Sequence, residues 1–228
     1  MLPHCRIMDR GRVKHGESNT MGRYTGPKLR KVRRFGEEFA LFTDRSTAAK
    51  FVKSNRKQPP GVHGGKTSFR KYTGYGLQLR EKQKAKIFYH VSESQMRKYY
   101  QLASNRAGSA SDNFMQILES RLDNVVYRAG WANSHPQARQ WLSHGQLSIN
   151  GRKITVPSIL IKLGDKLELT AKSSRLKETI SAYAAANKPV SWLKVDNTKF
   201  TIEIKDLPTR AEIDLPVDES LIIEFYSR

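Results

Sequence analysis

The amino-acid sequence predicts an α+β protein: a mainly helical domain with an inserted helix–helix–β-hairpin module and a basic, extended amino-terminal region. Three observations predict this class. Apolar residues recur at helical spacing over much of residues 77–145. The dipeptide Asn150-Gly151 separates two short alternating segments, as in a β-hairpin. Most of the positive charge lies in residues 1–100, which suggests a separable basic region.

The charge of the chain is strongly positive, and it restricts the classes of partner. The formal net charge is +20 at pH 7. Residues 1–100 hold 24 Lys and Arg against 7 Asp and Glu, whereas residues 101–228 hold 17 against 14. Such an excess favours a polyanionic partner. Nucleic acid is the first candidate, and an anionic membrane surface is the second. No apolar run approaches the ~20 residues of a membrane-spanning helix.

The amino-terminal part of the chain divides at Met21. Residues 1–20 are an extension of unknown status, without the apolar core of a secretory signal. Six basic residues then crowd into twelve positions: Arg23, Lys28, Arg30, Lys31, Arg33 and Arg34. Charges this dense form either a solvated tail or a tail ordered by phosphates, and the net charge favours the second. Residues 52–76 are basic and rich in Gly and Pro, as in an extended loop.

Patterns for disulfides, metals and nucleotides are missing from the sequence. The single cysteine, Cys5, cannot build a disulfide framework or a cysteine-rich zinc site. The pair His4 and Cys5, with His15 further along the chain, fits no zinc pattern in common use. The remaining histidines, His63, His90, His135 and His144, are scattered along the chain. We therefore expect no metal and no cofactor.

Two helices are predicted in the first half of the helical domain. Residues 77–90 show helical spacing, and Arg80, Lys82 and Lys84 lie on that segment. Ser92, followed three residues later by Gln95, is a capping-box pattern and predicts the start of a second helix. Apolar residues at three- and four-residue steps then favour core packing. The carboxyl-terminal segments "SWLKVD" and "LIIEFYS" are strand-like or buried in character, and we expect Leu193, Val195, Leu221, Ile223 and Phe225 to share this domain's core.

The sequence predicts one long helix over residues 112–129, with Gly130 as its carboxyl-terminal cap. Arg121 and Arg128 are seven residues apart, so they would lie on one face. That face is either solvent-exposed surface or a rigid clamp for phosphates.

The segment "SHPQARQWLSHGQLSINGRKITV", residues 134–156, predicts a helix followed by a hairpin. Ser134 and Gln137 form a capping-box pattern, and Gly145 ends the helix. Asn150-Gly151 predicts a type I′ turn between two short strands, and "DKLELT" predicts a further strand. Arg139, His144, Arg152 and Lys153 then face away from the core.

A family resemblance joins these segments. "SRLDNVVYRAGWANSHPQARQWLSHGQLSINGRKITVPS" resembles the RNA-binding module named after small-subunit ribosomal protein S4. "MGRYTGPKLRKVRRFG", "YGLQLREKQKAKIFYHVSESQMRKYY" and "LPTRAEIDLPVDESLIIEFYSR" resemble other parts of that family, in the same order. The resemblance covers about residues 21–228 and is to the bacterial or organellar type. Four amino-terminal cysteines found in many bacterial members are missing, so the chain resembles the zinc-free variant.

The resemblance implies a structural protein of the small ribosomal subunit that binds ribosomal RNA early in assembly. It also implies contacts with neighbouring ribosomal proteins near the messenger RNA entry path, an influence on decoding accuracy, and no catalysis. The ribosome would be cytoplasmic or organellar, and no membrane is involved. The expected organisation is a basic region ordered on RNA (21–66), a helical domain (67–111 with 182–228) and an inserted RNA-binding module (112–181).

The candidate RNA-binding residues share a basic or polar side chain outside the predicted core. They are Arg23, Lys28, Arg30, Lys31, Arg33, Arg34, Lys66, Arg70, Lys71, Arg80, Lys82, Lys84, Arg121, Arg128, Gln137, Arg139, His144, Arg152 and Lys153. Two alternatives are an RNA-modifying enzyme built on the same module and a free RNA chaperone. The enzyme would need a catalytic domain, and no stretch of the sequence supplies one.

Overall fold

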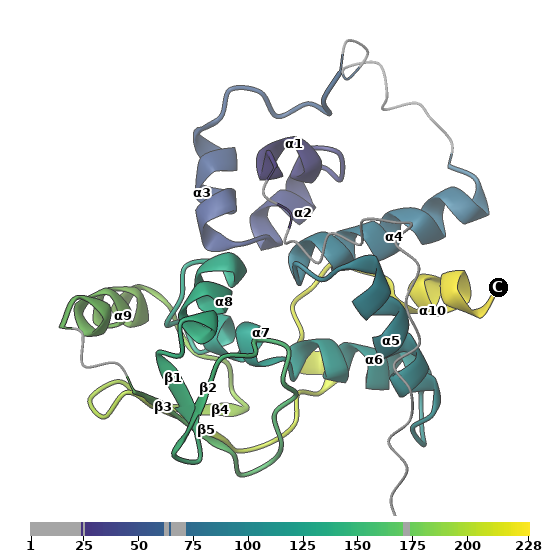
Figure 1. The fold of residues 1–228 in the computed structure, drawn as a ribbon. Coiled ribbons are helices and arrows are strands. Elements are labelled where there is room, and N and C mark those ends of the chain that lie inside the picture. Colours follow the sequence, from purple (N-terminus) through teal and green to yellow (C-terminus); the bar gives the residue numbers. More distant parts are fainter. Residues whose placement is uncertain (1–23, 25, 62–63, 65–71, 171–173) are drawn as a thin grey trace, which may run out of the picture.

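The computed structural model describes residue 24, residues 26–61, residue 64, and residues 72–170 and 174–228. The described chain has two hydrophobic cores, one between helices and one between helices and an antiparallel sheet (Figure 1). The predicted α+β fold class is confirmed. Among the described residues, no helix is both long enough and apolar enough to cross a membrane.

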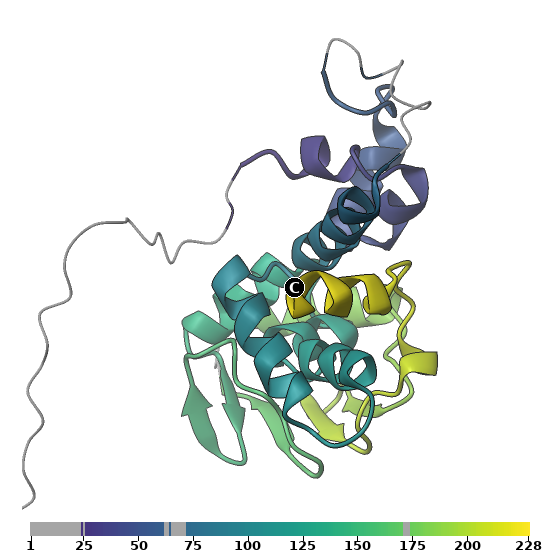
Figure 2. The same ribbon diagram turned by 90° about the vertical axis from the view of Figure 1, so that its right-hand side faces the viewer.

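Three short helices open the described chain: α1 (Lys28–Val32), α2 (Glu37–Phe42) and α3 (Arg45–Lys53). They lie at the opposite end of the molecule from the sheet (Figure 2). Val32, Phe39 and Phe51 are buried in the first core. The sequence predicted that this region is extended and becomes ordered only on RNA. In the structure it forms helices that pack in the first core. Apolar side chains between the charges give residues 28–53 a hydrophobic face to bury.

Four longer helices complete the first core: α4 (Gly74–Phe88), α5 (Glu93–Ser104), α6 (Ala110–Glu119) and α10 (Glu219–Ser227). The predicted start of α5 is confirmed, since the side chain of Ser92 accepts a hydrogen bond from the backbone N–H of Gln95 (3.4 Å). A short 3₁₀ turn, η2 (Arg210–Glu212), precedes α10. The segment "LIIEFYS", strand-like in sequence, belongs to the helix α10 and packs Ile222 and Ile223 into the core.

The predicted long helix over 112–129 is wrong, because the chain breaks at Ser120 and Arg121. Arg121 has an extended backbone (φ −70°, ψ 139°) and forms a β-bridge with Leu160. The N–H of Ile161 donates to the carbonyl of Ser120 (2.9 Å), and the N–H of Leu122 donates to the carbonyl of Ile159 (2.9 Å). Pairing with this distant segment replaces the helical hydrogen bonds. A separate helix, α7 (Leu122–Arg128), then begins.

The second core lies between helices and a five-stranded sheet. The helices are α7, α8 (His135–Ser143) and α9 (Ser174–Ala186). The strands are β1 (Leu147–Ile149), β2 (Arg152–Ile154), β3 (Lys166–Leu169), β4 (Leu193–Asp196) and β5 (Thr201–Ile204). Their order is β2-β1-β3-β5-β4, with every neighbouring pair antiparallel. The predicted type I′ turn is confirmed by positive φ angles at Asn150 (49°) and Gly151 (78°).

Strands β4 and β5 belong to the core of the inserted unit and not to that of the helical domain. Leu193 and Val195 were predicted to pack in the helical domain, but both lie in the second core. The reason is that β5 pairs with β3, with Ile202 opposite Leu167. Conversely, α6 packs in the first core. We propose that the inserted unit runs from about residue 120 to Asp206, whose N–H still bonds to Trp192, in place of 112–181.

Candidate nucleic-acid interface

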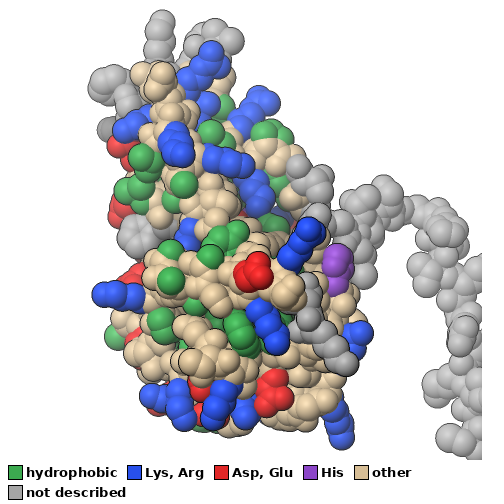
Figure 3. All heavy atoms as spheres, turned by 90° about the vertical axis from the view of Figure 1, so that its left-hand side faces the viewer, with side chains coloured by type: hydrophobic (Ala, Val, Ile, Leu, Met, Phe, Trp, Pro, Cys, Tyr) green, Lys and Arg blue, Asp and Glu red, His purple; other side chains and the backbone are tan. Residues whose placement is uncertain are grey.

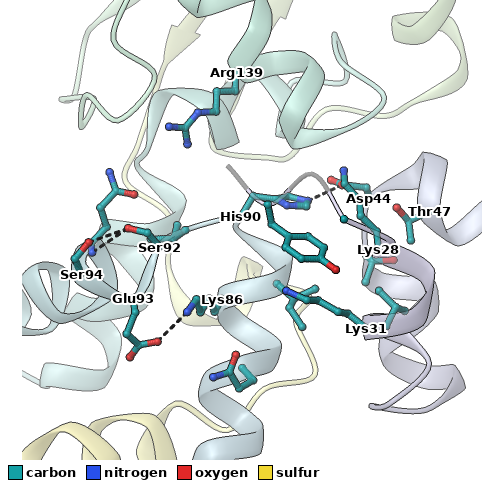
Figure 4. A pocket seen from close by; sticks show the side chains of 18 of the residues that line it. Lys28, Lys31, Asp44, Thr47, Lys86, His90, Ser92, Glu93, Ser94 and Arg139 are labelled. Carbon is teal, nitrogen blue, oxygen red and sulfur yellow. Dashed lines mark hydrogen bonds and ion pairs between the residues drawn. The ribbon is translucent and has the colours of Figure 1, made fainter. Parts of the chain in front are cut away.

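A cleft of about 830 Å³ opens where α1, the start of α3, the turn between α4 and α5, and α8 meet (Figure 4). We call it the basic cleft because five cations line it: Lys28, Lys31, Lys86, Lys98 and Arg139. Two acidic residues, Asp44 and Glu93, line it as well, but each is held by basic partners of the protein. The cleft therefore presents excess positive charge to a ligand.

The α1 wall of the cleft carries two lysines three residues apart, Lys28 and Lys31, which adjacent helical turns place close together. The Lys31 ammonium lies 3.2 Å from the centre of the Tyr24 ring. Burial lowers the pKa of Lys31, and the nearby charges of Lys86 and Arg34 lower it further. Cations that repel one another in this way are stabilised when an anion binds among them.

The opposite wall of the cleft is α8, and it contributes Arg139. The neighbouring Ala138 and Leu142 are fully buried, so they fix the helix against the second core. The Arg139 side chain extends from α8 toward the cleft (Figure 4). Within the described part of the chain, its guanidinium has no hydrogen-bond or ion-pair partner. Its five N–H donors are therefore available for a phosphate or carboxylate.

The start of α5 forms a third side of the cleft, over residues 92–95. Backbone N–H groups at the beginning of a helix carry partial positive charge and favour anions. Glu93 in this turn forms ion pairs with Lys82 (2.9 Å) and Lys86 (3.1 Å). Burial raises the pKa of Glu93, but hydrogen bonds from Lys82, Lys86 and Tyr226 lower it overall. Glu93 thus stays ionised and neutralises part of the charge of Lys86.

A second basic surface, which we call the hairpin surface, consists of His144, Arg152 and Lys153. All three are exposed, as predicted, and β2 is an edge strand of the sheet. Gly145, which ends α8, has a φ of +65°, and a Cβ at this position would overlap the Cε of Lys153. Glycine therefore lets the Lys153 side chain lie across the end of α8.

The predicted phosphate clamp of Arg121 and Arg128 is wrong, because both guanidiniums are used inside the protein. Arg121 is completely buried and forms two bonds with the Asp123 carboxylate (3.0 and 2.6 Å). Arg128 bonds in the same two-pronged way to the buried Glu119 (3.1 and 2.6 Å). Arg121 lies at the helix break on extended backbone, whereas Arg128 ends α7, so the two do not share a helix face and each pairs with its own carboxylate.

Four other predicted residues also serve the fold. Lys82 is buried (5% exposed), and its ammonium lies 4.2 Å from the Phe225 ring as well as against Glu93. Lys84 pairs with Glu81 (2.7 Å). Arg80 donates to the carbonyl of Phe35 (3.1 Å). Gln137 accepts from the backbone N–H of Asn133 (3.0 Å), and Ser134 makes no side-chain cap, so the predicted capping box is wrong.

The remaining candidates divide between exposed and undescribed positions. Arg30 and Arg34 are exposed on and just after α1, and Arg33 donates to the carbonyl of Gln58 (2.8 Å). Lysines and arginines gather over this amino-terminal end of the molecule (Figure 3). Four predicted residues lie outside the described residues: Arg23, Lys66, Arg70 and Lys71.

Sequence patterns missed Lys86 and Lys98 as cleft residues. They lie on two different helices, α4 and α5, and only the fold brings both to the same cleft as Lys28 and Lys31. Asp44 was missed as well, although it lines the cleft just before the start of α3. A lysine on a basic helix surface carries no local signal that distinguishes a cleft position from a solvent-exposed one.

The α+β fold thus carries two basic surfaces, the basic cleft and the hairpin surface, whose charge suits a polyanionic ligand. The family pattern described as "Ribosomal protein S4/S9 N-terminal domain" matches residues 23–119, and the "S4 domain" pattern matches residues 120–167. The boundary between the two patterns coincides with the break between α6 and α7.

Full-length relatives show the family. The chain is 46% identical over 209 residues to "Small ribosomal subunit protein uS4" of Dictyoglomus thermophilum, covering 91% of this chain and all of the relative. It is 43% identical over 210 residues to the protein of that name from Acetivibrio thermocellus, and 44% over 211 residues to the one from Halothermothrix orenii, with the same coverage. The chain belongs to the small ribosomal subunit protein uS4 family.

Proposed function

We propose that the protein is a structural, non-catalytic component of the small ribosomal subunit and binds small-subunit ribosomal RNA. The single observation that supports this most is the basic cleft, where Lys28 and Lys31 face Arg139 across an open volume. Membership of the uS4 family makes ribosomal RNA the polyanion expected there. The family names also argue against an enzyme built on the same module.

RNA binding would proceed by neutralising phosphates at several fixed points. The cleft supplies cations from α1, α4, α5 and α8, and the hairpin surface adds Arg152 and Lys153 on the inserted unit. Each phosphate that is neutralised releases counterions, which favours binding at low salt. Because both surfaces belong to folded elements, they select RNA by the spacing of its phosphates, as expected for double-helical or junction RNA.

Finer aspects of the proposal rest on the family resemblance. They are an early role in subunit assembly at a multi-helix junction, contacts with neighbouring ribosomal proteins near the messenger RNA entry path, and an influence on decoding accuracy. We also propose that the protein resides on the cytoplasmic ribosome. Co-sedimentation with small subunits tests the assembly role, and failure to co-sediment would favour the free RNA chaperone.

The test of RNA binding combines Arg139→Ala with Arg152→Ala, one residue from each surface. We expect the slope of log affinity against log salt to fall by about 1.5 to 2 units, with an unchanged melting temperature, because neither side chain packs in a core. Nitrocellulose filter binding to a transcript of bacterial small-subunit ribosomal RNA measures the slope.

The matched control combines Arg106→Ala with Lys205→Ala, two exposed cations outside both surfaces. It removes the same charge, so an equal loss of affinity would mean that net charge acts without a defined site. Conversion of a uridine in the RNA by the purified protein would contradict the non-catalytic proposal.

A further inference from the structure

Three residues that are far apart in the sequence meet at the base of the basic cleft: Asp44, His90 and His135. One carboxylate oxygen of Asp44 lies 2.6 Å from Nδ1 of His135, and the other lies 2.7 Å from Nε2 of His90. Asp44 and His135 are each 2% exposed. Asp44 precedes α3, His90 follows α4, and His135 begins α8, so the cluster joins three parts of the fold.

Asp44 also caps α8 from a distance of 91 residues along the chain. The backbone N–H of His135 donates to its Oδ1 (2.9 Å). Ser134, the residue that would normally cap this helix, makes no side-chain cap. Neighbouring contacts reinforce the attachment, since Arg45 donates to the carbonyls of Tyr127 (3.2 Å) and Ala132 (3.0 Å). The start of α8 therefore depends on the amino-terminal helices.

The hydrogen bonds around His135 require protons on both of its ring nitrogens. Asn124 donates its amide group to the carbonyl of Glu119 (3.0 Å), so its oxygen is the atom that faces Nε2 of His135 (3.0 Å). An oxygen acceptor there requires an N–H on Nε2. The other nitrogen, Nδ1, faces the carboxylate of Asp44, which also only accepts. His135 therefore carries two protons and a positive charge in this arrangement.

Asp44 and His90 take the complementary protonation states. Burial raises the pKa of Asp44, but the charge of His135 and hydrogen bonds from both histidines bring it well below the usual range. Burial lowers the pKa of His90, and Asp44 opposes that effect only in part. Neutral His90 needs one proton, on Nε2, to bond with Asp44. It holds this position with a φ of +51°, which is unfavourable for a residue with a Cβ.

The other charged groups around His135 do not supply a second carboxylate. Lys28 lies 3.5 Å from Oδ2 of Asp44, and Arg45 lies over the ring of Tyr127, which stacks on His135 with ring centres 4.1 Å apart. Arg128 and Glu119 nearby neutralise each other. The proton on His135 is therefore held by the two facing acceptors. The ammonium of Lys28 and the direct contacts between carboxylate and imidazole also disfavour a metal ion here.

We propose that Asp44, His90 and His135 form a hydrogen-bonded joint that holds α1–α3 against α8 and thereby sets the spacing of the basic cleft. Lys28 and Lys31 belong to one side of this joint, and Arg139 lies four residues after His135 on the other. Loss of Asp44 or His135 would leave buried polar groups of the other residue without their partner and would release the joint. The RNA part of this proposal rests on the proposed function, whereas the joint itself does not.

The first test compares two variants that remove the same negative charge, Asp44→Asn and Glu37→Gln. Glu37 lies exposed on α2 and outside the joint. Hydrogen exchange of the free protein measures opening of α1–α3, and filter binding measures affinity for the small-subunit RNA transcript. Charge alone would make both variants bind RNA slightly more tightly. If the joint exists, Asp44→Asn should exchange its α1–α3 amides at least tenfold faster than the wild type and should bind RNA more weakly. Glu37→Gln should exchange like the wild type.

The second test removes the other end of the joint. In His135→Gln, protection factors in α1–α3 should fall about tenfold, because the imidazole that joins Asp44 to Asn124 is removed. The matched control is His144→Gln, which removes an exposed histidine after the end of α8 and should exchange like the wild type. This comparison also stands if Asp44→Asn fails to fold.

Equal exchange in the Asp44 and Glu37 variants, with His135→Gln exchanging like the wild type, would overturn the joint. Faster exchange with unchanged RNA affinity would overturn its role in spacing the cleft. Failure of the wild type to bind RNA would refute the proposed function while the exchange measurements still test the joint. Stabilisation of the wild type by added Zn²⁺, missing in Asp44→Asn, would replace the joint by a metal site.

Discussion

Basic side chains have opposite surroundings in two regions of this molecule. At the junction of α6 and α7, Arg128 lies against the buried carboxylate of Glu119. In the basic cleft, Lys31 and Arg139 have no carboxylate partner among the described residues. The two regions show that the pairing of each charge separates the cations that hold the fold from those available to a ligand. The number of cations in a segment does not make that distinction.

In the paired region, the buried carboxylate of Glu119 is hydrogen-bonded by three residues. Glu119 is 1% exposed and accepts from Arg128, Asn124 and Tyr89. Burial raises the pKa of Glu119, but Arg128 and these hydrogen bonds lower it overall, so it stays ionised. Arg128 shows the reverse balance, since burial lowers its pKa and Glu119 raises it above the usual value. Each charge is therefore tolerated only because the other is present.

The largest effect is expected from Arg128→Ala, which leaves Glu119 buried without its counter-ion. Breaking a buried pair in this way costs about 3–5 kcal/mol of unfolding free energy, or a fall of about 10 °C in melting temperature. Thermal unfolding followed by circular dichroism measures it. Arg228→Ala is the control, since Arg228 is also paired with a glutamate but is exposed, and it should melt like the wild type. Equal melting temperatures for both variants would contradict the distinction.

The exposed cations should behave in the opposite way. Arg30→Ala combined with Arg34→Ala removes two exposed charges beside the cleft, so the melting temperature should not change. The slope of log affinity against log salt should fall by about 1.5 to 2 units, measured by filter binding over a salt series. An unchanged slope would mean that this end of the molecule does not contact RNA. Deleting residues 21–36 is a poorer test, because Val32 belongs to the core.

Local sequence signals predicted the elements whose hydrogen bonds are local. The helix start at Ser92 and the turn at Asn150-Gly151 were predicted correctly, because each depends on residues within four positions along the chain. The break at Ser120 and the pairing of β5 with β3 depend on segments about 40 residues away, so periodicity could not show them. The spacing of Arg121 in the sequence would be the same for a buried arginine and for an exposed one, so the pattern could not show that Arg121 is buried.

The candidate site was predictable in part for the same reason. Arg139 and Arg152 were found because the helix and hairpin that carry them have local signals. The histidines looked scattered in the sequence, yet His90 and His135 share one carboxylate in the fold. Their meeting depends on Asp44, 46 residues before His90 and 91 before His135. No spacing rule covers a cluster drawn from three separate elements.

Acidification should weaken the paired regions in two steps. Burial lowers the pKa of His90, so the unfolded chain takes up a proton below about pH 6.5 before the folded chain does. Unfolding free energy should therefore fall as the pH drops from about 6.5. A second fall should follow below about pH 4, because the pKa values of Asp44 and Glu119 are lowered in the folded state. Urea unfolding at a series of pH values measures both steps.

His90→Gln separates the two steps, since it removes the titrating imidazole and leaves the carboxylates. It should lose the upper step and keep the lower one. A wild-type stability that stays constant between about pH 7 and about pH 5 would contradict the buried, neutral state of His90.

The smallest effect distinguishes a glycine that serves the ligand surface from one that serves only the fold. Gly145 and Gly151 both have positive φ angles (65° and 78°), so alanine at either position should cost about 1 kcal/mol or somewhat more. The surroundings differ, because a Cβ at Gly151 meets open space, whereas one at Gly145 overlaps the side chain of Lys153. That side chain is flexible and can move aside, so the two variants should melt alike. Only Gly145→Ala should bind the RNA transcript more weakly, since it displaces a cation of the hairpin surface, and equal affinities would mean that Lys153 makes no contact there.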